Sequence, residues 1–218
     1  MKIALVCDDL IYHGGHENVV LELCRIFPDT PLYTTYISKD WKKICDKNNI
    51  SVHTSFLQKF PFVEKLNRYF APFLLHILAV ESFDFDEYDL VISISSRFAH
   101  GVITKPKTIN ICFMSTVGRM FWETGDYFKF ERSGIFKIFK NISRLFLALP
   151  LSYIRVWDKV ASNRVDFFAA NSITTQRRIK KYYGRDSEII HPFIDFDHPH
   201  SAGPPLPCLL SGRPYSYL

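Results

Sequence analysis

The residues best suited to chemistry lie at two places, a paired-glycine turn near the N-terminus and a polar loop in the middle of the chain. Gly14 and Gly15 follow an apolar run that ends in Asp8 and Asp9, and a helical pattern begins directly after them. Free backbone N–H groups and the positive end of a helix dipole gather at such a turn, which suits an anionic or polyhydroxyl ligand. The two glycines could equally serve only to let the chain turn tightly.

The charged residues around this turn have simpler explanations. Asp8 and Asp9 are adjacent at a strand exit, so their side chains should point in opposite directions and no carboxylate dyad is expected, although one of them could bond the glycine turn. His16 could contact a phosphate, but a lone histidine in a first helical turn is more often a surface residue. Glu17 is explained by the helix dipole alone.

The second place is the loop that follows an apolar run at 108–114. Ser115, Thr116, Arg119 and Trp122 lie there, at a strand end and loop, where open parallel sheets place their ligands. The hydroxyl groups of the serine and threonine can hydrogen-bond a polar ligand. Arg119 and Trp122 could instead anchor the loop, through a salt bridge and a stacked aromatic ring.

Two further candidates belong to a later strand–helix junction. Asn171 ends a strand-like run, and Asn or Ser at this point caps the following helix, which is the simpler explanation. Arg178 lies on a basic helical pattern at 172–183, for which a solvated face is the default interpretation.

Strand and helix patterns alternate along the chain, which predicts an α/β fold with a Rossmann-like, doubly wound, mostly parallel sheet. The strand patterns cover 3–7, 32–37, 51–54, 89–93, 108–114, 166–170 and 188–190. The helical patterns cover 15–27, 40–47, 62–80, 135–163 and 172–183, with a break or kink expected before Pro150 and an end at Gly184.

Composition narrows the class of protein. Of 218 residues, 47% are hydrophobic and 22% charged, with a net charge of +5, as expected of a globular core. There is no long basic run, so nucleic acid is not an expected partner. The five cysteines are scattered without metal-ligand spacing; Cys7 and Cys112 should be small buried hydrophobes, and no metal or other cofactor is expected. A reducing cytoplasmic location fits best, since the N-terminus does not read as a signal peptide.

Two segments raise other possibilities. The segment 135–157 mixes apolar side chains with Lys137, Lys140 and Arg144, so it could lie on the inner face of a membrane, although packing against the sheet explains it equally. Charges interrupt it too often for a spanning helix.

The segment 197–218 is rich in proline, has no acidic residue after Asp197 and no usable periodicity, and we expect it to be disordered. It is either a natural tail or the result of out-of-frame translation or a truncated gene, and we favour the latter.

Several motifs in order carry a resemblance to a known family. They start with the acidic pair before Gly14-Gly15-His16-Glu17 and the phrase Phe27-Pro28-Asp29-Thr30-Pro31. They continue at 52–57, 79–84, 88–96, 155–158, 170–172, 182–184 and 190–195. In these motifs, from residue 1 to about 196, the chain resembles a family 4 glycosyltransferase.

The resemblance implies a GT-B fold, in which an acceptor-binding N-terminal domain faces a donor-binding C-terminal domain and no metal is needed. This chain resembles the N-terminal domain only, over 1–196, and lacks the paired glutamates of the donor domain. Gly14 and Gly15 match the family's glycine loop, whose backbone approaches the acceptor and the donor phosphates. Ser115 stands where the family has a catalytic histidine, and Val117 where it has a proline. A serine hydroxyl is a poor proton acceptor near neutral pH, which puts catalysis in doubt.

The resulting hypothesis is the acceptor-binding part of a retaining hexosyltransferase, with a nucleotide-sugar donor and a glycan or lipid-linked acceptor, inactive alone. The alternative is a non-catalytic subunit that binds an acceptor or membrane and pairs with a separate donor-binding chain. A nicotinamide-dependent dehydrogenase is a weak third possibility, because the glycine fingerprint is incomplete. A half-enzyme would expose apolar surface, so self-association is expected.

Overall fold

The computed structural model describes residues 1–61, 63–64, 74–123 and 140–192, with side chains described from residue 148 onward in the last range. Much of the predicted helical segment 62–80, the first part of the segment 135–157 and the tail 197–218 therefore lie outside the described residues.

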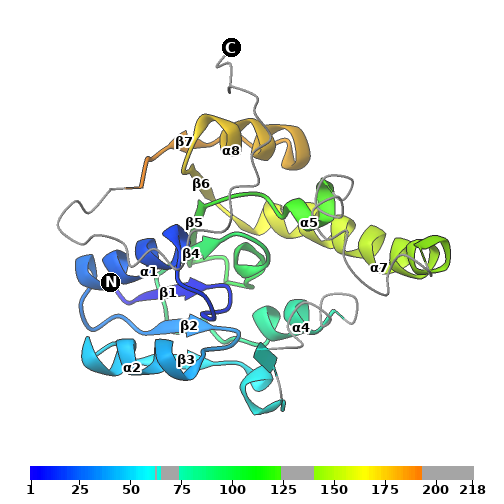
Figure 1. The fold of residues 1–218 in the computed structure, drawn as a ribbon. Coiled ribbons are helices and arrows are strands. Elements are labelled where there is room, and N and C mark those ends of the chain that lie inside the picture. The colour runs from blue at the N-terminus through cyan, green and yellow to red at the C-terminus, as the bar shows by residue number, and fades with distance from the viewer. Residues whose placement is uncertain (62, 65–73, 124–139, 193–218) are drawn as a thin grey trace, which may run out of the picture.

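A parallel sheet of seven strands organises the described chain, in the order β3-β2-β1-β4-β5-β6-β7 (Figure 1). The sheet confirms the predicted α/β, doubly wound class. Its strands are β1 (Ile3–Cys7), β2 (Leu32–Thr34), β3 (Val52–Thr54), β4 (Leu90–Ser95), β5 (Ile109–Met114), β6 (Phe167–Ala170) and β7 (Glu188–Ile189). Because β1 pairs with both β2 and β4, the strand order reverses at the β1–β4 pair.

Helices cover both faces of the sheet. They are α1 (Gly15–Ile26), α2 (Lys39–Lys47), α4 (Leu75–Glu81), α5 (Arg119–Trp122), α7 (Lys140–Ala161) and α8 (Ile173–Arg178), with a π-helical turn η6 (Ile179–Tyr183). Short 3-10 turns are η1 (Phe56–Lys59), η3 (Ala99–Gly101) and η5 (Ser162–Arg164). No helix among the described residues combines the length and apolarity needed to cross a membrane.

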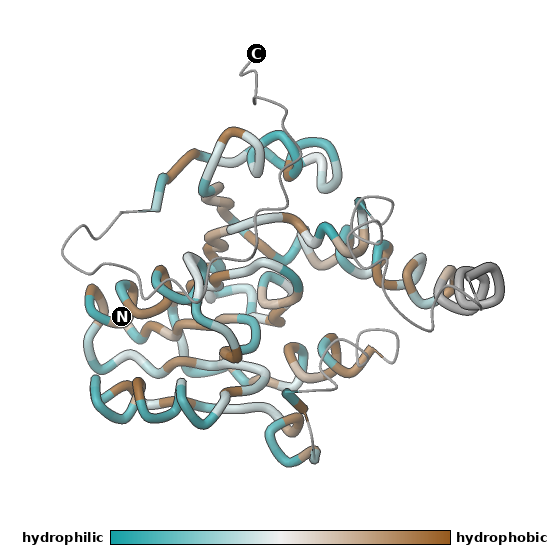
Figure 2. The backbone as a smooth tube through the Cα atoms, in the orientation of Figure 1, coloured by the Kyte–Doolittle hydropathy of each residue, from teal (hydrophilic) through white to brown (hydrophobic). Residues whose placement is uncertain are grey.

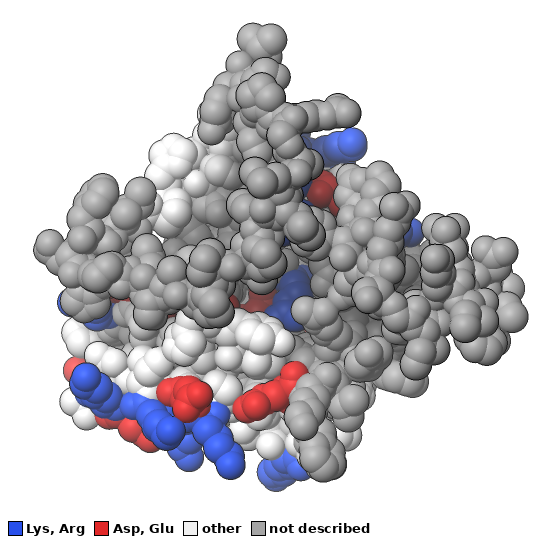
Figure 3. All heavy atoms as spheres, in the orientation of Figure 1, with Lys and Arg blue, Asp and Glu red and all other residues white. Residues whose placement is uncertain are grey.

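The alternation of side chains along β1 builds two cores. Leu5 and Cys7 pack with residues of α1 and α2 on one face, whereas Ala4 and Val6 pack with residues of α4 and α7 on the other. Figure 2 shows hydrophobic segments along the strands and hydrophilic ones on the outer turns of α2. In Figure 3, basic and acidic side chains are interspersed along the edge where α2 lies, so no single-sign patch forms there.

Several local expectations were met and others were not. Cys7 and Cys112 are buried, as predicted. The last helical segment ends at Gly184, whose φ of 71° is a left-handed conformation that favours glycine. The second strand is shorter than predicted, because after Thr34 the chain turns and pairs with the first strand's exit only through an Ile37–Leu10 bridge.

Of the predicted break or kink before Pro150, the structure contradicts the break. Helix α7 continues from Lys140 to Ala161 with Pro150 inside it. A proline removes one backbone donor and crowds one carbonyl, while the helix beyond it is held by Ile154, Trp157 and Ala161 in the core. The packing of α7 against the core therefore outweighs the tendency of proline to end a helix.

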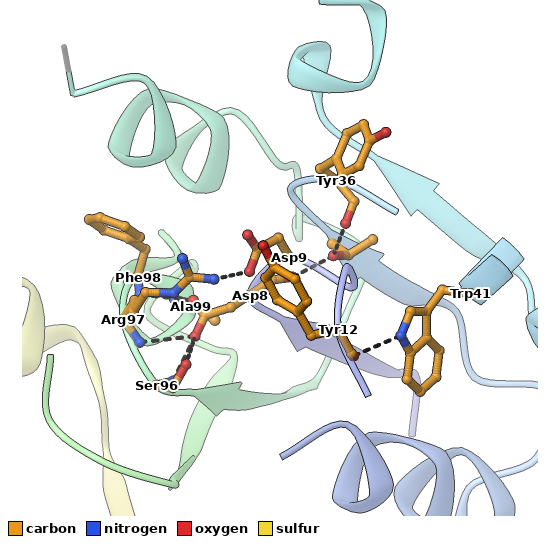
Figure 4. A network of polar contacts seen from close by, with 10 residues as sticks. Asp8, Asp9, Tyr12, Tyr36, Trp41, Ser96, Arg97, Phe98 and Ala99 are labelled. Carbon is orange, nitrogen blue, oxygen red and sulfur yellow. Dashed lines mark hydrogen bonds and ion pairs between the residues drawn. The ribbon is translucent and has the colours of Figure 1, made fainter. Parts of the chain in front are cut away.

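A buried carboxylate ties the sheet together where the strand order reverses. Asp8, 3% exposed, directly follows β1. Its Oδ2 accepts hydrogen bonds from Ser96 N at 2.6 Å, Ser96 Oγ at 2.9 Å and Arg97 N at 2.9 Å. Its Oδ1 accepts from Phe98 N at 2.8 Å and Ala99 N at 2.9 Å. Figure 4 shows this carboxylate facing the loop that follows β4.

Two further contacts reinforce this junction. The guanidinium of Arg97 pairs with Asp9, and Thr34 Oγ1 donates to the backbone oxygen of Asp8. Both aspartates contact the 96–99 loop, Asp8 through backbone N–H groups and Asp9 through the Arg97 guanidinium. Backbone N–H groups must find acceptors when buried, and the Asp8 carboxylate serves four of them. The expected bond between one aspartate and the glycine turn stays a prediction.

The pKa of Asp8 reflects these contacts. Burial alone would raise it, but the Arg97 guanidinium, the nearby His16 and the backbone N–H donors outweigh burial and lower the pKa from 3.8 to about 2. Asp8 is thus ionised at neutral pH.

We expect Asp8→Asn to lower the free energy of unfolding by about 3 kcal/mol at pH 7, because an amide cannot accept hydrogen bonds at both positions and leaves buried donors unpaired. Urea unfolding measures this. Asp186→Asn is the control, since the 91% exposed Asp186 side chain makes only a surface pair with Lys180. Equal losses for both variants would contradict the role assigned to Asp8.

The same contacts predict an acid dependence. A carboxylate with a lowered folded-state pKa stabilises the fold above its unfolded pKa and loses that contribution as the pH falls through the folded value. The stability difference between wild type and Asp8→Asn should therefore shrink by roughly 2 kcal/mol between pH 3.8 and about 2. Unfolding curves collected across this range test it, and a constant difference would refute it.

Candidate functional site

Polar residues follow four of the strands at one edge of the sheet, and two of these residues, Ser115 and Asn171, were predicted for the site. Asp8 follows β1, Ser96 follows β4, Ser115 follows β5 and Asn171 follows β6. The strand order reverses between the first two of these strands. Ligands of open parallel sheets bind outside the carboxyl ends of strands at such a reversal, so this edge is the candidate site.

The glycine turn leaves space beside this edge. Gly14, with φ of −166°, precedes α1 in an extended conformation that any residue can adopt. A Cβ on Gly14 would lie 3.0 Å from Glu17 Oε2, whereas a Cβ on Gly15 would meet no atom within 4 Å. The backbone conformation therefore does not require glycine at either position. Gly15 faces open space, as needed for the predicted approach of a ligand to the backbone.

His16 and Ser115 meet across the site. His16 Nδ1 lies 2.8 Å from Ser115 Oγ, a contact that joins the first turn of α1 to the end of β5. The interpretation of His16 as a surface residue was wrong: its ring is half-buried, and its Nε2 is shielded from solvent without a hydrogen bond in the described part of the chain. A shielded nitrogen without a partner is uncommon in native structures and is one mark of a functional group. Burial also raises the pKa of the neighbouring Glu17.

Arg178 is held by the loop that carries Thr116. Its Nε and Nη2 donate to Glu123 Oε1 and Oε2 at 2.9 and 3.0 Å, and its Nη1 donates to Thr116 Oγ1 at 3.3 Å. The Arg178 side chain is 25% exposed. The prediction of a solvated basic face is therefore wrong at this position, because the two-pronged pair with Glu123 draws the guanidinium inward.

Asn171 belongs to the same network through a residue that sequence reasoning missed. The buried Thr175 Oγ1 lies 2.7 Å from Asn171 Oδ1 and 3.2 Å from the Ser115 carbonyl oxygen. Ser172 Oγ accepts a hydrogen bond from Thr175 N at 3.3 Å, which confirms the predicted cap at the start of α8. Thr175 thus links two of the strand ends.

Trp122 is a structural anchor. Its Nε1 donates to the buried Asp158 Oδ2 at 2.7 Å, and its ring stacks on Tyr182 with centroids 4.8 Å apart. This contact ties α5 to α7. Arg119 is exposed at the first position of α5. The segment was predicted as a loop, but it forms this short helix, and the anchoring role proposed as an alternative fits Trp122.

A serine–histidine–aspartate arrangement lies beneath the site. His100 Nδ1 is 3.3 Å from Ser95 Oγ, and His100 Nε2 is 3.3 Å from Asp158 Oδ1. Nucleophilic catalysis would need an accessible serine. All three residues are 0% exposed, so they join β4, η3 and α7 and cannot meet an external substrate.

Two other kinds of feature could mark a site elsewhere in the described chain, a cluster of metal ligands and a hollow in the surface. In the described ranges, no group of three or more His, Cys, Asp or Glu side chains is placed to hold a metal ion. An open hollow of about 420 Å³ lies at the opposite edge of the sheet, around Lys2, Pro28–Pro31 and Tyr88. The polar side chains gather instead at the carboxyl ends of the strands.

Comparison with known proteins shows that the fold of this chain is similar to that of part of a solved protein. No protein-family model matches the sequence, and no curated protein does. Solved structures of Alr3699/HepE from Anabaena are similar: the complex with UDP at a TM-score of 0.51 and 15% identity, the complex with UDP and glucose at 0.49 and 13%, and the complex with UDP-glucose at 0.48 and 14%. Each alignment covers 89% of this chain and 45% of the other.

The likeness to the complex with UDP shows a shared fold and nothing beyond it. The chain spans less than half the length of the solved protein it matches. Membership of glycosyltransferase family 4, and the roles of Gly14, Gly15, His16, Ser115 and Arg178, stay predictions from the sequence.

Proposed function

We propose that this chain is the N-terminal, acceptor-binding part of a glycosyltransferase that moves a hexose from a nucleotide sugar to a glycan or lipid-linked acceptor. The observation that carries the proposal is the half-buried His16–Ser115 pair beside the open side of Gly15, at the carboxyl edge of the sheet. The similarity in fold to part of a protein solved with UDP supports it.

The charges around the site favour a neutral acceptor over a diphosphate. Of the arginines near this edge, Arg97 is paired with Asp9 and Arg178 with Glu123, whereas Arg119 is exposed at the start of α5. Asp8 is ionised as well. A diphosphate would need positive charge that these pairs do not leave available, whereas hydroxyl groups of a sugar can bond histidine, serine and backbone groups.

The nucleotide-sugar donor should bind in another part of the enzyme, for the same electrostatic reason. Stabilising a leaving diphosphate requires preorganised donors or cations aimed at it. We infer that a second, donor-binding domain supplies them, either in the same polypeptide or in a separate chain. The acceptor part alone would then bind a sugar without transferring one.

The isolated chain should therefore not transfer a hexose. The purified 218-residue protein, incubated with UDP-glucose or UDP-galactose and a panel of methyl hexosides, should give no glycosylated product by mass spectrometry. Transfer by the chain alone would contradict the assignment of the donor site to another domain. Co-purification of a donor-binding chain would favour the alternative of a separate binding subunit.

Binding by the isolated chain provides a second test. We expect at least one of methyl glucoside, galactoside and mannoside to shift the amide signals of Gly15, His16 and Ser115 in an NMR titration. Gly15→Leu should weaken this binding at least about tenfold, because its side chain would fill the open space next to the turn.

The variant is suited to this purpose because it should not harm the fold. Gly15 is the first residue of α1, and leucine is the better helix former, so the melting temperature should not fall. His13→Asn, on the same loop but stacked on Trp41, is the matched control and should bind as wild type does. Unchanged binding by Gly15→Leu would remove the glycine turn from the site.

A further inference from the structure

Four apolar side chains lie exposed along one side of α7. Leu149 is 80% exposed, Tyr153 56%, Val156 64% and Val160 53%. We call these four residues the α7 stripe. Nothing in the described part of the chain covers them, and single exposed apolar residues are common, but an aligned row of this kind marks an interaction surface.

The spacing of the stripe is that of a helix-pairing seam. Its members are separated by four, three and four residues, the alternation of the a and d positions of a heptad. A strict a/d row is narrower than the apolar face of a helix that packs on a core or lies on a membrane. The same alternation continues toward the N-terminus in the sequence, through Phe146, Ile142, Phe139 and Ile135.

The stripe is separate from the face by which α7 joins its own domain. Ile154, Trp157 and Ala161 point into the core. The helix is therefore already held in place, and in Figure 1 it extends away from the sheet toward its N-terminal end. A second helix could lie along the stripe without disturbing the fold.

The charges beside the stripe favour a helix over a membrane as the partner. Arg155 Nε donates to the Phe121 oxygen at 2.6 Å, and Lys159 Nζ donates to the Tyr183 oxygen. These are the two cations of α7 whose side chains the structure describes, and both are used inside the domain, whereas a helix on a lipid surface presents its basic residues to headgroups. The exposed neighbours Ala148 and Ser152 are small and uncharged, so two copies can approach closely without like-charge repulsion.

We propose that the α7 stripe pairs with the α7 stripe of a second copy of this chain to form a two-fold symmetric dimer. The complementary seam that the spacing requires is present in the chain itself, and an isologous contact closes without further growth. Four side chains cover less than the roughly 800 Å² per partner of stable complexes, so the dimer should dissociate in the micromolar range. The proposal does not depend on the proposed enzymatic function.

Sedimentation equilibrium of the 218-residue chain between about 5 and 200 µM tests the dimer. Wild type should fit a monomer–dimer equilibrium. Val156→Glu places a charge in the middle of the seam and should weaken the dimer at least about tenfold. Its circular dichroism and melting temperature should match wild type, because the position is exposed.

Ile26→Glu is the matched control. Ile26 is 60% exposed at the end of α1, outside the stripe, so this variant should dimerise as wild type does. A wild-type protein that stays monomeric over the whole range overturns the proposal, as do equal effects of the two variants. Monomeric protein that sediments with phosphatidylserine-containing vesicles, and loses this property in Val156→Glu, would assign the stripe to a membrane and also overturn the dimer.

Discussion

The hydrogen bonding of one buried carboxylate underlies the architecture of the candidate site. Asp8 receives the backbone N–H groups of the loop after β4, and so binds the exit of β1 to the exit of the neighbouring strand. These are the two strands between which the sheet reverses its order. Charge-assisted hydrogen bonds to several buried donors are strong and directional. They fix the exits of β1 and β4 relative to each other, at the edge of the sheet where the glycine turn and the residues after β5 and β6 also lie.

The rest of the site is assembled by pairing charges within the domain. Arg97 and Arg178 each meet a carboxylate, and the His16–Ser115 contact bridges α1 and β5. The surface beside Gly15 is therefore polar, and neither Arg97 nor Arg178 contributes an unpaired positive charge to it. That balance suits hydroxyl groups better than phosphates. It gives a physical reason for separating the binding of an acceptor from the binding of a donor, and for placing the latter in a second domain.

The sheet could be predicted, and a candidate site placed at its strand ends, because both depend on local patterns. Apolar runs of strand length, and the glycines directly after the first of them, mark the strand ends without any tertiary information. The contacts that join these side chains to one another and to the backbone could not be predicted. His16 and Ser115 are 99 residues apart in the sequence, and Arg178 lies in a basic segment that reads as solvated. The partners of Asp8 are mainly backbone N–H groups, which every residue except proline has, so no residue type reveals them.

A crystal structure of the chain with a bound methyl hexoside would locate the sugar without assuming a site. We expect the sugar over Gly15, with its hydroxyl groups in contact with His16 or Ser115 and with Arg178 still paired to Glu123. A sugar bound instead in the hollow around Pro28–Pro31, at the opposite edge of the sheet, would contradict this expectation.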